Sequence, residues 1–217
     1  PYISTIYFGG GTPTYLEIKY IKEIFDEIKA CFNLTLNYEA SIEANPGTVN
    51  LQKLILLKEI GINRLSIGAQ SFKDEHLRIL GRTHTESQIY YTFNSARRAS
   101  FQNISLDLIF GIPDQTLPDW INTLSKAISL APEHISTYCL KIEEGTPLYR
   151  ERGNLNLVGE DIEYLMFDET VTALKASGFE HYEISNFARP NFRCRHNETY
   201  WKNEEYIGVG AGATSYI

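Results

Sequence analysis

The sequence has few cysteines and no long apolar segment. Its three cysteines, Cys31, Cys139 and Cys194, lie far apart and match neither a disulfide framework nor the spacing of metal ligands. No run approaches the roughly 20 apolar residues of a transmembrane helix, and no signal peptide is visible. Basic residues are scattered and the net charge is −7, which argues against nucleic acid as a main partner. We therefore expect reduced thiols and a cytoplasmic protein.

The two ends of the sequence are typical of a fragment. The chain begins at Pro1 without a methionine and stops at Ile217, directly after a glycine-rich segment that resembles a strand. Its 217 residues, 43% of them hydrophobic, are enough for one domain with a real core. We expect a longer parent protein.

Strand-like and helix-like segments alternate along the chain. Alternating or continuous apolar runs predict strands at 3–8, 36–44, 62–70, 103–110, 134–142 and 182–187. Apolar residues at helical spacing predict helices at 15–32, 51–60, 74–80, 85–100, 117–130 and 161–177. This order predicts a mostly parallel sheet with helical crossovers.

The predicted strands are apolar on one face only. The opposite face carries small or polar residues, among them Glu39, Ser41, Glu43, Arg64, Ser66, Gln70, Ser105, Asp107, Thr137, Cys139 and Lys141. An open sheet covered by helices on both faces would be apolar on both, whereas a closed eight-stranded barrel would fill its interior with bulky side chains. The pattern favours a wider, incompletely closed (β/α) barrel with helices outside and a polar, ligand-filled interior.

Three glycines follow the first predicted strand. In Phe8-Gly9-Gly10-Gly11-Thr12-Pro13-Thr14 the backbone can bend sharply and approach a ligand, because no Cβ intervenes. Threonine hydroxyls follow, and Pro13 is tolerated in the first turn of a helix. The segment is a candidate ligand shelf, although an ordinary tight turn explains it equally well.

Polar residues also mark the carboxyl ends of the later strands, where (β/α) barrels place their chemistry. Glu43, Gln70, Asp107 and Lys141 would meet the glycine turn at one rim. Each has a plain structural alternative: Glu43 can satisfy turn amides, Gln70 can cap a helix, and Asp107 can be a paired buried acid.

Six segments together resemble the radical S-adenosylmethionine (SAM) family. They are FGGGTPTYL, SIEANPGT, INRLSIGAQSF, LGRTH, ISLDLIFGIPDQT and YEISNFARP, and the match is to the branch that holds oxygen-independent coproporphyrinogen III oxidase and related heme chaperones. The resemblance implies an α/β fold, a partial (β/α)6 barrel. It places residues 1–180 in this barrel without its first βα unit. Residues 181–217 would be the last strand region and a segment leading toward a missing C-terminal domain.

The resemblance also implies site residues. Gly10, Gly11 and Thr12 match the glycine motif around the amino-acid part of SAM, and Glu43 matches a carboxylate that contacts this cofactor. Gln70, Arg82 and Asp107 match residues that line a second SAM site. Lys141 lies at a position where the family uses the backbone and not the side chain, so the resemblance assigns no role to the Lys141 side chain.

The family's 4Fe-4S cluster is held by a Cys-x3-Cys-x2-Cys loop that precedes the glycine motif. We expect those cysteines upstream of Pro1, so that this fragment holds no metal ligands. Cys31, Cys139 and Cys194 do not replace them, because a cluster needs thiolates gathered in one place.

The segment His-Asn-x-x-Tyr-Trp at 196–201 resembles the heme-chaperone branch. The resemblance implies a protein that binds heme, with His196 as the candidate ligand, and delivers it to respiratory enzymes. The structural alternative is that His196 pins a loop to the barrel. Two other functions stay open: the oxidase itself, and a barrel enzyme that cradles a sugar phosphate in the glycine turn.

Overall fold

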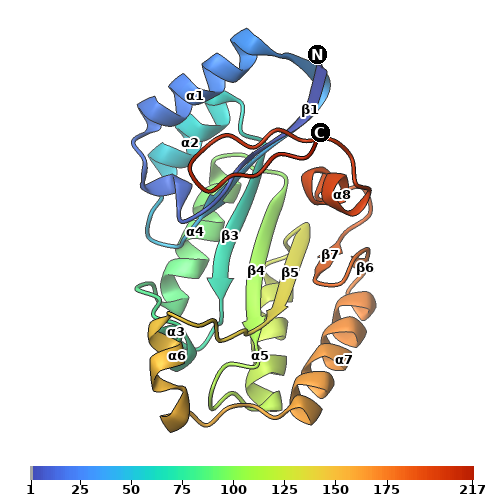
Figure 1. Cartoon of the computed structure of the whole chain (residues 1–217). Helices are drawn as coiled ribbons and strands as arrows, with labels where there is room; N and C mark the ends of the chain where they lie inside the picture. The colour runs from blue at the N-terminus through green and yellow to red at the C-terminus, as the bar shows by residue number, and fades with distance from the viewer. Residues whose placement is uncertain (1) are drawn as a thin grey trace.

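One curved sheet of seven strands organises the chain in the computed structural model, which describes residues 2–217. Its strands are β1 Tyr2–Phe8, β2 Asn33–Ala44, β3 Arg64–Gln70, β4 Ile104–Phe110, β5 His134–Cys139, β6 Glu180–His181 and β7 Asn186–Ala188. Their spatial order is β1-β2-β3-β4-β5-β7-β6. Neighbours from β1 to β5 are parallel, whereas β7 is antiparallel to both β5 and β6. The predicted partial barrel is confirmed as an open, curled half-barrel (Figure 1).

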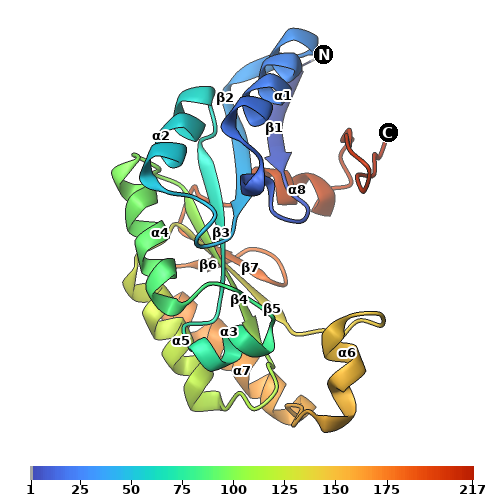
Figure 2. The same ribbon diagram turned by 90° about the vertical axis from the view of Figure 1, so that its left-hand side faces the viewer.

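Helices lie between the strands along the chain, and a last helix follows β7. They are α1 Ile18–Cys31, α2 Leu51–Ile60, α3 Asp74–Ile79, α4 Glu86–Arg98, α5 Leu117–Ser129, α6 Pro147–Glu151, α7 Glu160–Ala176 and α8 Arg195–Trp201, with 3-10 turns η1 Pro13–Tyr15 and η2 Arg152–Asn154. Figure 2 shows α2, α4 and α5 along one face of the sheet and α8 on the opposite side. No helix among residues 2–217 is long and apolar enough to cross a membrane.

The hydrophobic core lies between the sheet and its outer helices. On the outer face of the sheet Ile42, Leu65 and Leu106 are fully buried, and Phe25 of α1 and Trp120 of α5 are buried as well. These strand residues are the apolar set of the sequence pattern, so the helices cover one face and leave the polar face toward the inside of the half-barrel. Burying such large side chains stabilises the fold by about 1.5–3 kcal/mol each.

Local signals begin and end the helices. The side chain of Asn50 accepts a hydrogen bond from Lys53 N–H at the start of α2, and Gly61 ends that helix at φ 119°, a conformation that favours glycine. Thr116 and Asp119 form a reciprocal capping box at the start of α5. These caps set where each polypeptide segment turns back into the sheet.

The C-terminal part differs from the sequence prediction. The predicted strand 182–187 is a hairpin whose turn follows His181 and whose second strand, β7, begins at Asn186. Ser185 O accepts a hydrogen bond from Thr137 N–H, which ties this turn to β5. Helices α6 and α8 are absent from the prediction, because each is short and lacks a clear apolar period.

The predicted faces of β5 are wrong. His134, Ser136 and Tyr138 line the inside of the half-barrel, and Cys139 points outward, where its Sγ and the Glu163 carboxylate of α7 both lie beside Gly111. The strand carries small or polar residues on both faces, so its sequence does not show which face is inside.

Candidate functional site

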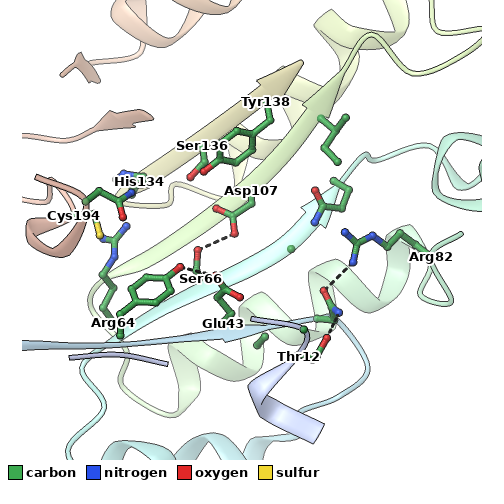
Figure 3. A pocket seen from close by; sticks show the side chains of 18 residues that line it. Thr12, Glu43, Arg64, Ser66, Arg82, Asp107, His134, Ser136, Tyr138 and Cys194 are labelled. Atoms are coloured by element: carbon green, nitrogen blue, oxygen red, sulfur yellow. Dashed lines mark hydrogen bonds between the residues drawn. The ribbon is translucent and has the colours of Figure 1, made fainter. Parts of the chain in front are cut away.

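A polar cavity of about 340 Å³ occupies the inside of the half-barrel (Figure 3). Its walls come from all five parallel strands and from the C-terminal segment. The lining residues are Tyr7, Gly11, Thr12, Glu43, Ala44, Asn45, Arg64, Ser66, Gly68, Gln70, Arg82, Asp107, Ile109, His134, Ser136, Tyr138, Cys194 and Asn197. Six predicted residues, Gly11, Thr12, Glu43, Gln70, Arg82 and Asp107, therefore line one space, and the seventh, Gly10, is bonded to Glu43.

The glycine turn offers open backbone at the rim of the cavity. Gly10 and Gly11 have φ values of 82° and 59°, in the left-handed region. A Cβ at either position would meet no atom within 4 Å, so the space beside this backbone is free. Glycine is required here by the backbone conformation, and the free space lets a ligand approach the main chain.

Glu43 fixes the glycine turn from the neighbouring strand. Its Oε1 accepts a hydrogen bond from the Tyr7 hydroxyl at 2.8 Å, and its Oε2 accepts one from Gly10 N–H at 3.2 Å. Burial raises the pKa of the Glu43 carboxyl, against the hydrogen bond from Tyr7, which lowers it. The carboxylate therefore positions the shelf and faces the cavity at the same time.

Asn45 is a site residue that the sequence prediction missed. Its Nδ2 donates to Thr12 Oγ1 at 2.7 Å, and its Oδ1 accepts from Arg82 Nη1 at 3.4 Å. The amide thus joins the glycine turn after β1 to the loop after α3. The segment Asn45-Pro46-Gly47 is typical of a strand end. Its sequence therefore predicts a turn and does not show that Asn45 also contacts Thr12 and Arg82.

Gln70 ends β3 in a conformation that non-glycine residues rarely adopt, with φ 63°. The pairing register of β3 with β4 shifts just before it. A Cβ on Gly68 would lie 2.8 Å from both Asn45 Oδ1 and Gln70 Nε2, so glycine lets these two amides approach the strand. Gln70 lines the cavity. Residues in such rare backbone conformations are often found at binding sites.

Asp107 lies mid-strand in β4 and faces the cavity. Its Oδ2 accepts from the Ser66 hydroxyl at 2.8 Å and its Oδ1 from the Ser105 hydroxyl at 3.2 Å. Burial raises the pKa of the Asp107 carboxyl, although the hydrogen bonds from Ser66 and Ser136 lower it. Asp107 is therefore a hydrogen-bonded acid without a cation within 4.0 Å among residues 2–217.

A hydrogen-bond chain runs from Asp107 to the C-terminal segment. Ser105 Oγ also lies 2.8 Å from His134 Nδ1, and His134 Nε2 lies 2.8 Å from the Tyr182 hydroxyl, which accepts from Cys194 N–H at 3.3 Å. Burial lowers the pKa of His134 well below its usual value, so its ring is neutral. No sequence signal marks His134, because a lone histidine at a strand start is usually structural.

His196 lies beside the cavity and is not among its lining residues. Its ring stacks on Tyr7 with centroids 5.0 Å apart, and its backbone N–H donates to Glu39 Oε1 at 3.2 Å. Lys141 follows the end of β5 and does not line the cavity, so its predicted convergence on the rim is not observed.

The three cysteines are free and do not meet. Within the described residues, no group of three histidine, cysteine, aspartate or glutamate side chains could hold a metal ion. This part of the chain does not fit an iron–sulfur cluster. It does fit a polar, amino-acid-bearing cofactor, because open glycine backbone, carboxylates, amides and a guanidinium all face one cavity.

Comparison with known proteins decides the family. Residues 1–127, more than half of the chain, match the Radical SAM superfamily. The chain belongs to the radical SAM superfamily. This confirms the resemblance seen in the sequence, and membership implies SAM and a 4Fe-4S cluster as cofactors of the radical SAM protein.

Several relatives match along nearly the whole chain. The heme chaperone HemW of Bacillus subtilis is 42% identical over 220 residues, which cover 100% of this chain and 58% of that protein. HemW of Escherichia coli is 37% identical over 211 residues, covering 97% of this chain and 55% of that protein. This radical SAM chain thus spans little more than half the length of these relatives.

Solved radical SAM structures share the fold. Coproporphyrinogen III oxidase (HemN) from Escherichia coli, a radical SAM enzyme, superposes with a TM-score of 0.85 at 27% identity, covering 100% of this chain and 53% of that one. The archaeal Elp3 of Methanocaldococcus infernus, at a TM-score of 0.62 and 19% identity over 78% of this chain and 44% of that one, shows the fold alone.

Proposed function

We propose that this chain is the central part of a radical SAM heme chaperone. The observation that carries the proposal is the 42% identity with the heme chaperone of Bacillus subtilis over the whole chain, against 27% with the oxidase. In this proposal residues 1–180 are the barrel without its first βα unit, and residues 181–217 are the last strand region and the segment that leads toward a C-terminal domain. The proposal also places the protein in the cytoplasm, where free thiols such as Cys31 stay reduced.

The cavity would hold SAM through the residues predicted from the sequence. We propose that Gly10, Gly11 and Thr12 receive its amino-acid part, since their backbone is open and held by β2. Glu43 would accept hydrogen bonds from its amino group. The amide of Gln70, the guanidinium of Arg82 and the carboxylate of Asp107 would contact its polar groups or those of a second SAM molecule.

When bound, the 4Fe-4S cluster supplies an electron for reductive cleavage of SAM. The described residues do not group ligands for this cluster. What this chain contributes is therefore the binding and orientation of the ligand inside the half-barrel.

His196 is the proposed heme ligand, and respiratory proteins are the proposed acceptors of the heme. A neutral imidazole ligates heme iron, and burial lowers the pKa of His196, against the Glu39 carboxylate, which raises it. Tyr200 and Trp201 beside it are 45% and 57% exposed, as aromatic side chains that pack on a porphyrin would have to be.

Two measurements test this function on the protein with its cluster loaded. Titration with heme under reducing, anaerobic conditions should give a saturable Soret change at one site per chain. Incubation with coproporphyrinogen III should give no product, because the proposed protein carries heme and does not decarboxylate its precursor. Turnover of coproporphyrinogen III without heme binding would favour the oxidase, the second candidate, whose structure matches this fold at a TM-score of 0.85.

A further inference from the structure

The deep end of the cavity contains a buried cation with free donors. Arg64 is the first residue of β3 and is only 2% exposed. Its Nη1 donates to Asn103 Oδ1 at 2.7 Å and reaches Phe192 O at 3.5 Å. Its Nε and Nη2 have no hydrogen-bond partner among residues 2–217, and no carboxylate there lies within 4.0 Å of the guanidinium. Buried charges in proteins are normally paired, but this arginine has no carboxylate directly paired with it.

The two carboxylates whose charge acts on Arg64 are already engaged by other donors. Glu39 accepts hydrogen bonds from the Cys194 thiol and from the backbone N–H groups of Arg195 and His196. Asp107 accepts from two serine hydroxyls. Neither carboxylate turns to the guanidinium, so the free N–H groups of Arg64 are left for a molecule in the cavity.

A second donor faces the same end. Asn197 of α8 lines the cavity, and its side-chain amide has no hydrogen bond within the described residues. Figure 3 shows Arg64 and Cys194 at one end of the cavity and Arg82 with Thr12 at the other. Gln70, at the rim, lies six residues further along β3 (64 to 70), a distance of about 20 Å at the usual rise of a strand. Arg64 therefore lies at the opposite end of β3 from the rim.

We propose that Arg64 and Asn197 form a binding site for a carboxylate group of a ligand inside the half-barrel. A guanidinium binds a carboxylate through two parallel hydrogen bonds, and the unpartnered Nε and Nη2 are the pair of atoms that such a contact uses. The amide of Asn197 adds a third donor. The carboxylate comes either from a tetrapyrrole propionate, which rests on the proposed function, or from the amino-acid end of a second SAM molecule.

Sodium propionate, compared with sodium chloride at equal ionic strength, is the first probe. It should raise the melting temperature of the wild-type protein by about 2–4 °C, because a ligand of the folded state stabilises it. Arg64→Gln and Asn197→Ala should lose this rise. Arg78→Gln is the matched control, since Arg78 pairs with Glu75 on the surface and should respond as the wild type does.

The outcome decides the proposal even if one variant is unstable. Arg64→Lys keeps the charge without the paired donors and should retain a smaller rise, while Asn197→Ala changes only a partly exposed residue. The carboxylate site would be overturned if propionate raised the melting temperature equally in the wild type, Arg64→Gln and Asn197→Ala. It would also be overturned if propionate did not raise the melting temperature of the wild type.

Two further arms identify the source of the carboxylate. Heme and heme dimethyl ester differ only in free propionates, and methylthioadenosine lacks the amino-acid end and the sulfonium charge of SAM. In the ligand pair that uses the site, Arg64→Gln should weaken binding of the compound with the free carboxylate by tenfold or more. The same variant should bind the compound without that carboxylate as the wild type does. If heme fails to bind the wild type, the chaperone function falls, and the propionate result still decides the role of Arg64.

Discussion

Thr5 and His196 are 191 residues apart in the chain, yet Thr5 Oγ1 lies 3.1 Å from His196 Nδ1. The other ring nitrogen, Nε2, lies 2.8 Å from the Tyr200 hydroxyl. Both nitrogens thus have protein partners, and an iron at either one would replace a hydrogen bond. Because Tyr200 is exposed, Nε2 is the nitrogen that is easier to release, while Thr5 would keep the ring oriented.

Replacing His196 tests its role as a heme ligand. His196→Ala should lower heme affinity by tenfold or more and shift the Soret band, because a coordination bond is lost. Tyr200→Phe should bind heme as well as the wild type or better, since a competing hydrogen bond is gone. His181→Ala is the control, because that ring stacks on Phe187 away from the C-terminal helix. Unchanged titrations of His196→Ala would remove this residue from the role.

Alanine at Gly10 should impair both stability and SAM binding. Its φ of 82° costs a residue with a Cβ about 1–2 kcal/mol, which chemical denaturation measures. Gly145→Ala meets a similar φ of 86° with nothing within 4 Å, in a loop before α6. The two variants should lose similar stability, but only Gly10→Ala should weaken SAM in calorimetric titration. Equal SAM affinities would mean that the turn has no part in binding.

Asn45→Ala should separate site geometry from stability. Loss of the hydrogen bonds to Thr12 and Arg82 should cost about 1 kcal/mol of unfolding free energy and lower SAM affinity severalfold. Asn63→Ala removes hydrogen bonds to Tyr38 O and Ala40 N on β2, the strand that Asn45 follows. This variant should lose a similar free energy of unfolding and keep its affinity for SAM. If both variants lose affinity equally, the effect is general loosening of β2.

Asp107 and Asp119 should affect pH-dependent stability with opposite signs. Burial raises the pKa of Asp107, so the folded state holds this proton more tightly and stability falls as pH rises above about 3.8, the ordinary value. Burial would also raise the pKa of Asp119, but Lys73 and Thr116 lower it to about 2, so its contribution is present above 3.8 and is lost as pH falls toward 2.

Denaturation of the two asparagine variants across pH checks this. Asp107→Asn should become more stable relative to the wild type as pH rises above about 3.8. Asp119→Asn should become less stable relative to the wild type as pH rises from about 2 to about 3.8. The same sign for both variants would contradict the assigned pKa directions.

The sequence predicts most of the sheet because three of the parallel strands have one clearly apolar face. In β2, Ile42 faces the helices and Glu43 the cavity, and the pattern of β3 and β4 is equally clear. Alternation of apolar and polar residues is therefore sufficient to assign Glu43, Gln70 and Asp107 to the inside of the half-barrel. The glycine turn is also predicted from the sequence, since glycine permits the positive φ values that Gly10 and Gly11 adopt.

The sequence does not predict the contacts that tertiary structure alone creates. Asn45 joins two loops, and His134 joins β4 to the hairpin, through partners distant in the chain. Both faces of β5 carry polar groups, so periodicity is uninformative there. The pattern assigns Arg64 to the polar face, but only the placement of Asn103 and the C-terminal segment around it shows that its donors are incompletely used.

The glycine turn is held from β2 at two points, by Glu43 on Gly10 and by Asn45 on Thr12. Its conformational entropy is therefore given up when the protein folds and not when a ligand arrives. Preorganisation of this kind makes affinity depend on the contacts themselves. It also implies that association is governed by diffusional encounter with the cavity, with no slow loop closure to observe in stopped-flow traces.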